Sequence, residues 1–180
     1  LLACAACCNA NKPAGTGWVS IGDPGNQGSP RKGMGAVGHI YEIGIHEVTI
    51  AEFRKARDRN QDVSNGNEDV WLDVGTHAPA ANVSWYEAAK YCNYLTTGNP
   101  YQGVYRFRAS GRTGGADESE CYAGIERNYR NDEGVAYRLP TEPEWFKAAF
   151  YNVDKESFHQ WSNASDLEPG TSEARYDAAT

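Results

Sequence analysis

The sequence predicts an α+β fold made of short helices, short strands and long irregular loops. Three segments place a hydroxyl residue three positions before a glutamate and continue with apolar and alanine residues, a pattern that starts helices. Other segments alternate apolar and polar residues over a few positions, as short strands do. Glycine, proline and asparagine separate these segments. A chain of 180 residues is long enough for one domain with one hydrophobic core.

Each helix start has the sequence of a capping box. The hydroxyl accepts a hydrogen bond from an N–H of the first turn, and the glutamate accepts one from the N–H of the hydroxyl residue. The three pairs are Thr49 with Glu52, Ser84 with Glu87, and Thr141 with Glu144. We therefore expect helices over residues 50–59, from 85 to about 97, and from 142 onward. A glutamate that closes a helix end gives no indication of acid–base catalysis.

The second and third helices each place one tryptophan and two alanines on a single face. These residues are Trp85, Ala88 and Ala89 in one helix, and Trp145, Ala148 and Ala149 in the other. Small residues let two helices approach closely, and a neighbouring indole ring fills the remaining space. We therefore expect these residues to form the core, with the two helices packed together against a small sheet.

Strands and loops occupy the remaining segments. Apolar and polar residues alternate over 18–21 and over 103–107, which predicts two short strands. The apolar positions within 36–48 predict a longer strand that leads into the first helix. Asp23-Pro24-Gly25-Asn26 is a strong turn signal. The glycine-rich segment 101–135 is long for a loop, and we interpret it as a decorated hairpin whose role the sequence does not define.

Three segments in order resemble the formylglycine-generating-enzyme family, also called the sulfatase-modifying-factor or FGE-sulfatase domain. They are YEIGIHEVT at 41–49, PAANVSWYEAAKYCNYL at 79–95 and YRLPTEPEWFKAA at 137–149. The resemblance covers the N-terminal part of the family domain only. It implies a C-type-lectin-like fold, in which short helices flank small antiparallel sheets. The resemblance implies an incomplete FGE-sulfatase-like domain over residues 18–161, and a polar tail or loop follows over 162–180.

The resemblance also implies where the family chemistry should lie. Family members are copper-dependent enzymes that oxidise a substrate cysteine at a pair of cysteines, and they carry calcium-binding loops in the C-terminal half. Nothing after Trp161 resembles those elements, so in a longer chain the catalytic cysteines are expected beyond Thr180. We expect no catalytic, cofactor-binding or metal-binding residue within these 180 residues.

Residues 1–17 resemble an exported tail or the remnant of a secretory leader. Leu1-Leu2-Ala3-Cys4 also resembles a bacterial lipoprotein box, which would place a lipid on Cys4, and both alternatives predict a location outside the cytoplasm. The chain has five cysteines, an odd number. We expect Cys4, Cys7 and Cys8 to be available for cross-linking or lipidation, since they lack the further ligands of a zinc site. A Cys92–Cys121 disulfide is compatible with the sequence.

Composition and motifs exclude several classes of function. The net charge is −7 with a pI near 5.1, and no stretch concentrates lysine and arginine, so nucleic acid is not an expected partner. No window approaches the roughly 20 apolar residues of a membrane helix. Gly33-Met34-Gly35-Ala36-Val37-Gly38 has glycine spacing found in dinucleotide sites, but a strand rather than a helix is expected after it. The four histidines lack metal-ligand spacing, and we expect them at surface or lightly buried positions.

Two functions remain. The first is a non-catalytic extracytoplasmic module that acts in structure or recognition, as a surface subunit that associates with other protein subunits or with itself. The second is a fragment of a formylglycine-generating-type oxidase. Membrane association is expected only if Cys4 is lipidated. The cysteine-rich start and the acidic composition favour the first function.

Overall fold

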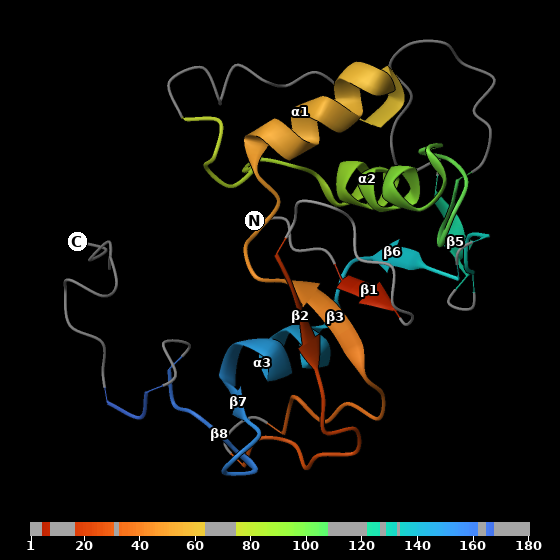
Figure 1. Cartoon of the computed structure of the whole chain (residues 1–180). Coiled ribbons are helices and arrows are strands. Elements are labelled where there is room, and N and C mark those ends of the chain that lie inside the picture. The colour runs from red at the N-terminus through yellow and green to blue at the C-terminus, as the bar shows by residue number, and fades with distance from the viewer. Residues whose placement is uncertain are drawn as a thin grey trace. The chain divides into compact units, whose positions relative to one another are not determined.

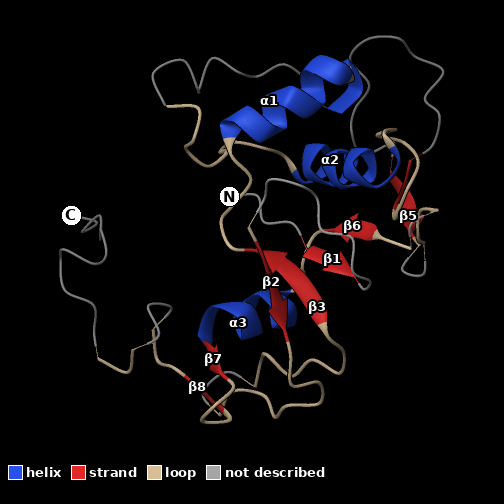
Figure 2. Cartoon of the chain, viewed as in Figure 1, coloured by secondary structure: helices blue, strands red, loops and turns tan. Residues whose placement is uncertain are grey.

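The computed structural model describes residues 5–7, 17–30, 33–63, 75–107, 122–126, 129–132, 134–161 and 165–167. The chain divides into two compact units. Unit 1 comprises residues 1–20 and 41–139, and unit 2 comprises residues 21–40 and 140–180. The described part holds three α-helices, a 3₁₀ helix and short strands whose resolved pairings are antiparallel (Figure 2), which confirms the α+β class.

Two helices of unit 1 lie side by side (Figure 1). Helix α1 spans Ile50–Arg59 and leads into the 3₁₀ helix η1, Gln61–Val63, and helix α2 spans Trp85–Thr97. Both α-helices begin with the predicted capping box. Helix α2 ends at Gly98, whose φ of 76° is the left-handed conformation that glycine adopts most readily. The predicted limits of both helices are therefore confirmed.

A four-stranded sheet has the order β2-β3-β1-β6. Its strands are Trp18–Ile21, Tyr41–Gly44, Ala5–Cys7 and Ala136–Arg138, in that order. Strand β1 pairs antiparallel with both β3 and β6. The sequence assigned residues 5–7 to a tail, and the structure corrects this, because their backbone forms a central strand of the sheet.

Strand β3 is shorter than the predicted strand over 36–48. The earlier part of that segment belongs to a loop of unit 2, where the Asn26 side chain holds the backbone. Asn26 Nδ2 donates to the carbonyl of Gly35 at 2.8 Å, and the N–H of Val37 donates to Asn26 Oδ1 at 3.2 Å. The pattern of apolar residues over 36–48 carries no information on the Asn26 side chain, which takes the backbone hydrogen bonds that a neighbouring strand would otherwise form.

Strands β4, Tyr105–Phe107, and β5, Tyr122–Ile125, form an antiparallel pair with an irregularity between Arg106 and Phe107. This confirms a hairpin within the segment 101–135, although its connection over 108–121 lies outside the described residues. Arg106 and Glu126 form an ion pair at its edge.

The core of unit 1 lies among α1, α2, β4 and β6. It includes Ile50, Phe53, Val63, Ala88, Ala89, Cys92, Val104 and Ala136, which are buried. The two alanines of α2 are core residues as predicted, but the prediction for Trp85 was wrong. Its side chain is 45% exposed, because the first residue of α2 rests against the rings of Tyr86 and Tyr105 at the edge of the core.

Unit 2 contains helix α3, Glu142–Phe150, and the short strands β7, Tyr151–Asn152, and β8, Ser157–Phe158. The capping box of Thr141 and Glu144 is present. Trp145 is 49% exposed, so its prediction as a core residue was wrong, and Ala148 and Ala149 are only partly buried. Helix α3 instead buries Phe146, whose ring stacks with that of Phe150. Since α2 and α3 belong to different units, their mutual packing stays a prediction.

Candidate functional site

Unit 1 contains a pocket of about 420 Å³ beside the N-terminus of helix α1. This volume lies within the range of small-ligand sites. The side chains that define its character come from β2, the β3–α1 connection, the loop before α2, α2 itself and β6. They are Trp18, His46, Glu47, His77, Tyr91 and Tyr137.

Backbone hydrogen bonds hold the pocket segments against one another. Two N–H groups of the first turn of α1 donate to carbonyls of the loop before α2, Ile50 to Ala78 and Ala51 to Thr76, both at 2.9 Å. The N–H of Ile45 donates to the carbonyl of Gly17 at 2.8 Å. These bonds satisfy donors that a helix start leaves open, and they position His77 and Trp18 relative to the β3–α1 connection.

Aromatic rings form the inner part of the pocket. The rings of Trp18 and Tyr137 lie with their centroids 5.7 Å apart and their planes inclined by 59°. Tyr91 is buried and stacks on Phe53 at 5.4 Å. The N–H of Tyr137 donates to Thr96 Oγ1 at 3.0 Å, which connects β6 to α2. These contacts hold the aromatic part in place before any ligand binds.

The polar side chains of the pocket divide into two groups. Glu52 is committed to the helix cap, where its Oε2 accepts from Thr49 N at 2.9 Å and from Thr49 Oγ1 at 2.8 Å. His46 and His77 are exposed and Glu47 is partly buried. Within the described part of the chain, none of these last three side chains forms a hydrogen bond or an ion pair. They are the polar groups of the pocket that remain available to a ligand.

Sequence reasoning recognised Thr49 and Glu52 as a cap but did not find the pocket that they border. Both histidines were expected at surface or lightly buried positions, and both are exposed. Their convergence with Trp18 and Tyr137 depends on strand pairing and on the loop before α2. The three segments that carried the family resemblance, 41–49, 79–95 and 137–149, each contribute to the pocket lining, and they were the sequence signals near this site.

The predicted cysteine chemistry falls mostly outside the described residues. Cys92 is fully buried on α2, whereas Cys121 is not described, so their disulfide stays a prediction. Cys4 and Cys8 are likewise not described, and Cys7 is the last residue of β1. Their roles in cross-linking or lipidation also stay predictions.

Across the described ranges, no three His, Cys, Asp or Glu residues converge as metal ligands. None of the described helices is long and apolar enough to cross a membrane.

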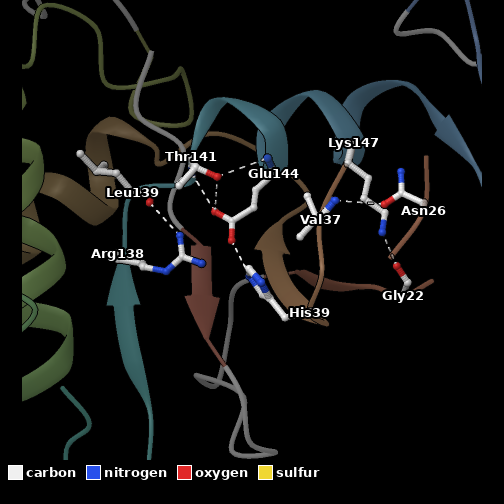
Figure 3. Close-up of polar contacts among 9 residues, drawn as sticks. All are labelled: Gly22, Asn26, Val37, His39, Arg138, Leu139, Thr141, Glu144 and Lys147. Atoms are coloured by element: carbon white, nitrogen blue, oxygen red, sulfur yellow. Dashed lines mark hydrogen bonds and ion pairs between the residues drawn. The ribbon is translucent and has the colours of Figure 1, made fainter. Parts of the chain in front are cut away.

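A second polar cluster lies in unit 2, where Figure 3 shows Glu144 between Thr141 and His39. The Glu144 side chain is 2% exposed, and its Oε1 lies 2.7 Å from Nε2 of His39. Its Oε2 accepts from Thr141 N at 2.8 Å and from Thr141 Oγ1 at 2.9 Å. Both carboxylate oxygens are thus occupied by partners within the unit, which is the pattern of a structural residue.

Lys147 completes this cluster and is 1% exposed. Its Nζ donates to the carbonyls of Gly22 at 2.8 Å and Asp23 at 2.6 Å, and Figure 3 shows it directed toward Gly22. Burial lowers the pKa of Lys147, and the charge of Asp23 opposes that shift. The Asp23 carboxylate also accepts a hydrogen bond from Tyr151 Oη. These contacts hold Gly22 and the first residue of the turn at 23–26 against α3.

The comparison with protein families finds a match to the sulfatase-modifying factor enzyme 1-like domain over residues 15–178. No curated protein and no solved structure matches the chain. The match includes the three segments on which the resemblance rested and extends on both sides of them. The chain therefore belongs to the FGE-sulfatase domain family.

Proposed function

We propose that this chain is a non-catalytic recognition module of the FGE-sulfatase family, with a C-type-lectin-like fold, and that it binds a ligand in the pocket of unit 1. The observation that carries the proposal is the combination of fixed aromatic walls with three polar side chains, His46, Glu47 and His77, that form no hydrogen bond or ion pair in the described part of the chain. Pockets that bind small molecules have this composition, with mostly apolar walls and a few convergent polar groups.

The distribution of the ionisable side chains supports recognition rather than catalysis. Glu52, Glu87 and Glu144 bind backbone at helix starts, and Lys147 binds backbone carbonyls. The one cysteine whose side chain is described, Cys92, lies in the core. A cysteine that oxidises a substrate must be reachable and ionisable, and burial among apolar groups opposes both.

The proposed location is extracytoplasmic, and the proposed partners include other protein subunits. The odd number of cysteines and the acidic composition favour both. The lectin-like architecture is favoured by the family membership and by the short helices beside small antiparallel sheets.

The test is a binding screen by two-dimensional NMR on the purified chain. Small molecules of three classes are titrated: ammonium cations, phosphate or carboxylate anions, and uncharged sugars. We expect members of one class to shift the backbone amides of Gly17 and Gly44 and the indole N–H of Trp18. The control signal is the amide of Gly25, which belongs to unit 2 and does not line the pocket, and we expect it to be unaffected.

A second arm tests the absence of catalysis. The chain is incubated with copper(I), oxygen and a cysteine peptide, and the peptide mass is measured. We expect the cysteine to remain unconverted. Formation of formylglycine would refute the non-catalytic assignment, and failure of all three classes to bind at the pocket would refute recognition there.

A further inference from the structure

The pocket of unit 1 combines negative charge with aromatic surface. Two carboxylates, Glu47 and Glu52, line it, and none of its described lining residues is a lysine or an arginine. Glu52 accepts hydrogen bonds within its cap, so its charge is fixed at the pocket edge. Glu47 has no described partner and is free to meet a ligand. This charge distribution favours a cation and disfavours phosphate or carboxylate.

The aromatic rings favour the same ligand charge. A cation is attracted to the face of an aromatic ring when it lies within about 6 Å of the centroid, most strongly for tryptophan. The centroids of Trp18 and Tyr137 are 5.7 Å apart, so one cation in the pocket can lie within that distance of both. Their 59° inclination makes the pair a corner rather than a flat stack. Tyr91 adds a third ring.

We infer that the pocket binds a small organic ammonium ion, with the cationic group in the corner formed by Trp18 and Tyr137 and with Glu47 as its counter-ion. This inference rests on the proposed recognition function and specifies its ligand class. A quaternary ammonium suits the site, because it is weakly hydrated and needs no hydrogen-bond acceptors, while ring faces and one carboxylate can surround it. His46 and His77 supply hydrogen-bonding groups for a polar substituent.

The experiment compares choline with 3,3-dimethylbutan-1-ol, which has the same shape but no charge. Binding to the full chain is measured by NMR titration at low salt. We expect choline to bind about tenfold more tightly than the alcohol, since cation–π attraction and one counter-ion together supply a difference of that order. Equal affinities would overturn the inference while leaving apolar recognition intact.

Two variants assign the effect to the named groups. Glu47→Gln is expected to weaken choline binding about tenfold and to leave the alcohol unchanged. Its matched control is Asp62→Asn, which makes the same change in net charge at an exposed residue of η1 outside the pocket. Trp18→Leu keeps an apolar side chain but removes the ring, and should reduce the preference for choline over the alcohol.

Further arms separate this inference from the proposed function and from other sources of the same cation. Binding of sugars or anions at the pocket, with no binding of choline, would refute the ammonium inference but support recognition. Binding of phosphatidylcholine vesicles without free choline would also overturn it, because the ligand would then be a membrane surface. If none of these probes binds at the pocket, the proposed function fails with the inference.

Discussion

Asn93 and Tyr105 exchange two hydrogen bonds between a helix side chain and a strand backbone. Asn93 Nδ2 donates to the Tyr105 carbonyl at 2.6 Å, and the Tyr105 N–H donates to Asn93 Oδ1 at 2.9 Å. The second proton of Nδ2 binds the carbonyl of Pro100 at 2.9 Å. The Asn93 amide therefore supplies the donor and the acceptor that a neighbouring strand would offer to the Tyr105 backbone. It also attaches the β4–β5 hairpin to α2.

Asn93→Asp is expected to destabilise the chain strongly. The change replaces the Nδ2 group, which donates to the carbonyls of Pro100 and Tyr105, by a carboxylate oxygen that has no proton to donate. The oxygen then faces both carbonyl groups in a fully buried site. We expect a loss of about 3 kcal/mol in the free energy of unfolding, measured by urea denaturation. Asn99→Asp is the matched control, because Asn99 is exposed and uses only its Oδ1, which accepts from Tyr101 N. A similar loss in both variants would contradict the assigned role of Asn93.

Gly103→Ala tests the same contact from the opposite side. A Cβ atom at residue 103 would lie 2.4 Å from Asn93 Oδ1 and 3.1 Å from Asn93 Cα. Because Asn93 is held by three hydrogen bonds, it cannot move aside without losing at least one of them. We expect a loss of about 2 kcal/mol in thermal or urea unfolding.

Gly38→Ala serves as its control. No described atom lies within 4 Å of a Cβ built there, and the backbone does not require glycine. This variant should unfold within about 0.5 kcal/mol of wild type. If Gly103→Ala were equally neutral, the close approach of residue 103 to Asn93 would be wrong.

Local signals predicted the helices well. Each capping box is encoded within four residues and depends on nothing distant, so Thr49, Ser84 and Thr141 were correctly identified as helix caps. The start and end of α2 followed from Ser84 and Gly98 for the same reason. The α+β class then followed from the presence of both helix and strand signals.

Burial was harder to predict, because it depends on what faces the helix. In α3, the sequence favoured Trp145 as the buried residue, but Glu144 and Lys147 occupy the interior. Their partners are far away in sequence: His39 is 105 positions from Glu144, and Gly22 is 125 positions from Lys147. No local pattern contains that information. The pocket of unit 1 escaped prediction for the same reason, since separate segments form it.

Lys147→Met should destabilise unit 2. Methionine retains most of the side-chain volume but leaves the carbonyls of Gly22 and Asp23 without their donor. Relief from burying a charge offsets part of this loss, since burial already lowers the pKa of Lys147. We expect a net loss of about 1–2 kcal/mol in urea unfolding.

Lys155→Met is its control, because Lys155 is exposed and only its backbone N–H forms a described hydrogen bond. Hydrogen exchange provides a second measurement that is specific to this contact. Amides near the turn at 23–26 should exchange faster in Lys147→Met but not in Lys155→Met. Unchanged exchange at that turn in both variants would show that Lys147 does not hold it.

Tyr151 should give this chain a distinctive alkaline titration. The hydrogen bond to Asp23 is the main cause that raises the pKa of Tyr151 to about 12, with burial and the charges of Asp23 and Glu156 adding to it. The folded state thus favours the neutral phenol. Its stabilising contribution is fully present below the unfolded tyrosine pKa of about 10, and it is lost as the pH rises through the folded pKa.

We therefore expect the ultraviolet titration of the folded chain to contain one phenolate transition near pH 12 that Tyr151→Phe removes. Asp23→Asn should shift that transition to lower pH, because it removes the anionic acceptor while retaining a residue that tolerates the φ of 51° at this position. The stability advantage of wild type over Tyr151→Phe should also shrink between about pH 10 and 12. Identical phenolate curves for wild type and Asp23→Asn would mean that Asp23 does not hold the Tyr151 hydroxyl, and the link between the 23–26 turn and β7 would have to be abandoned.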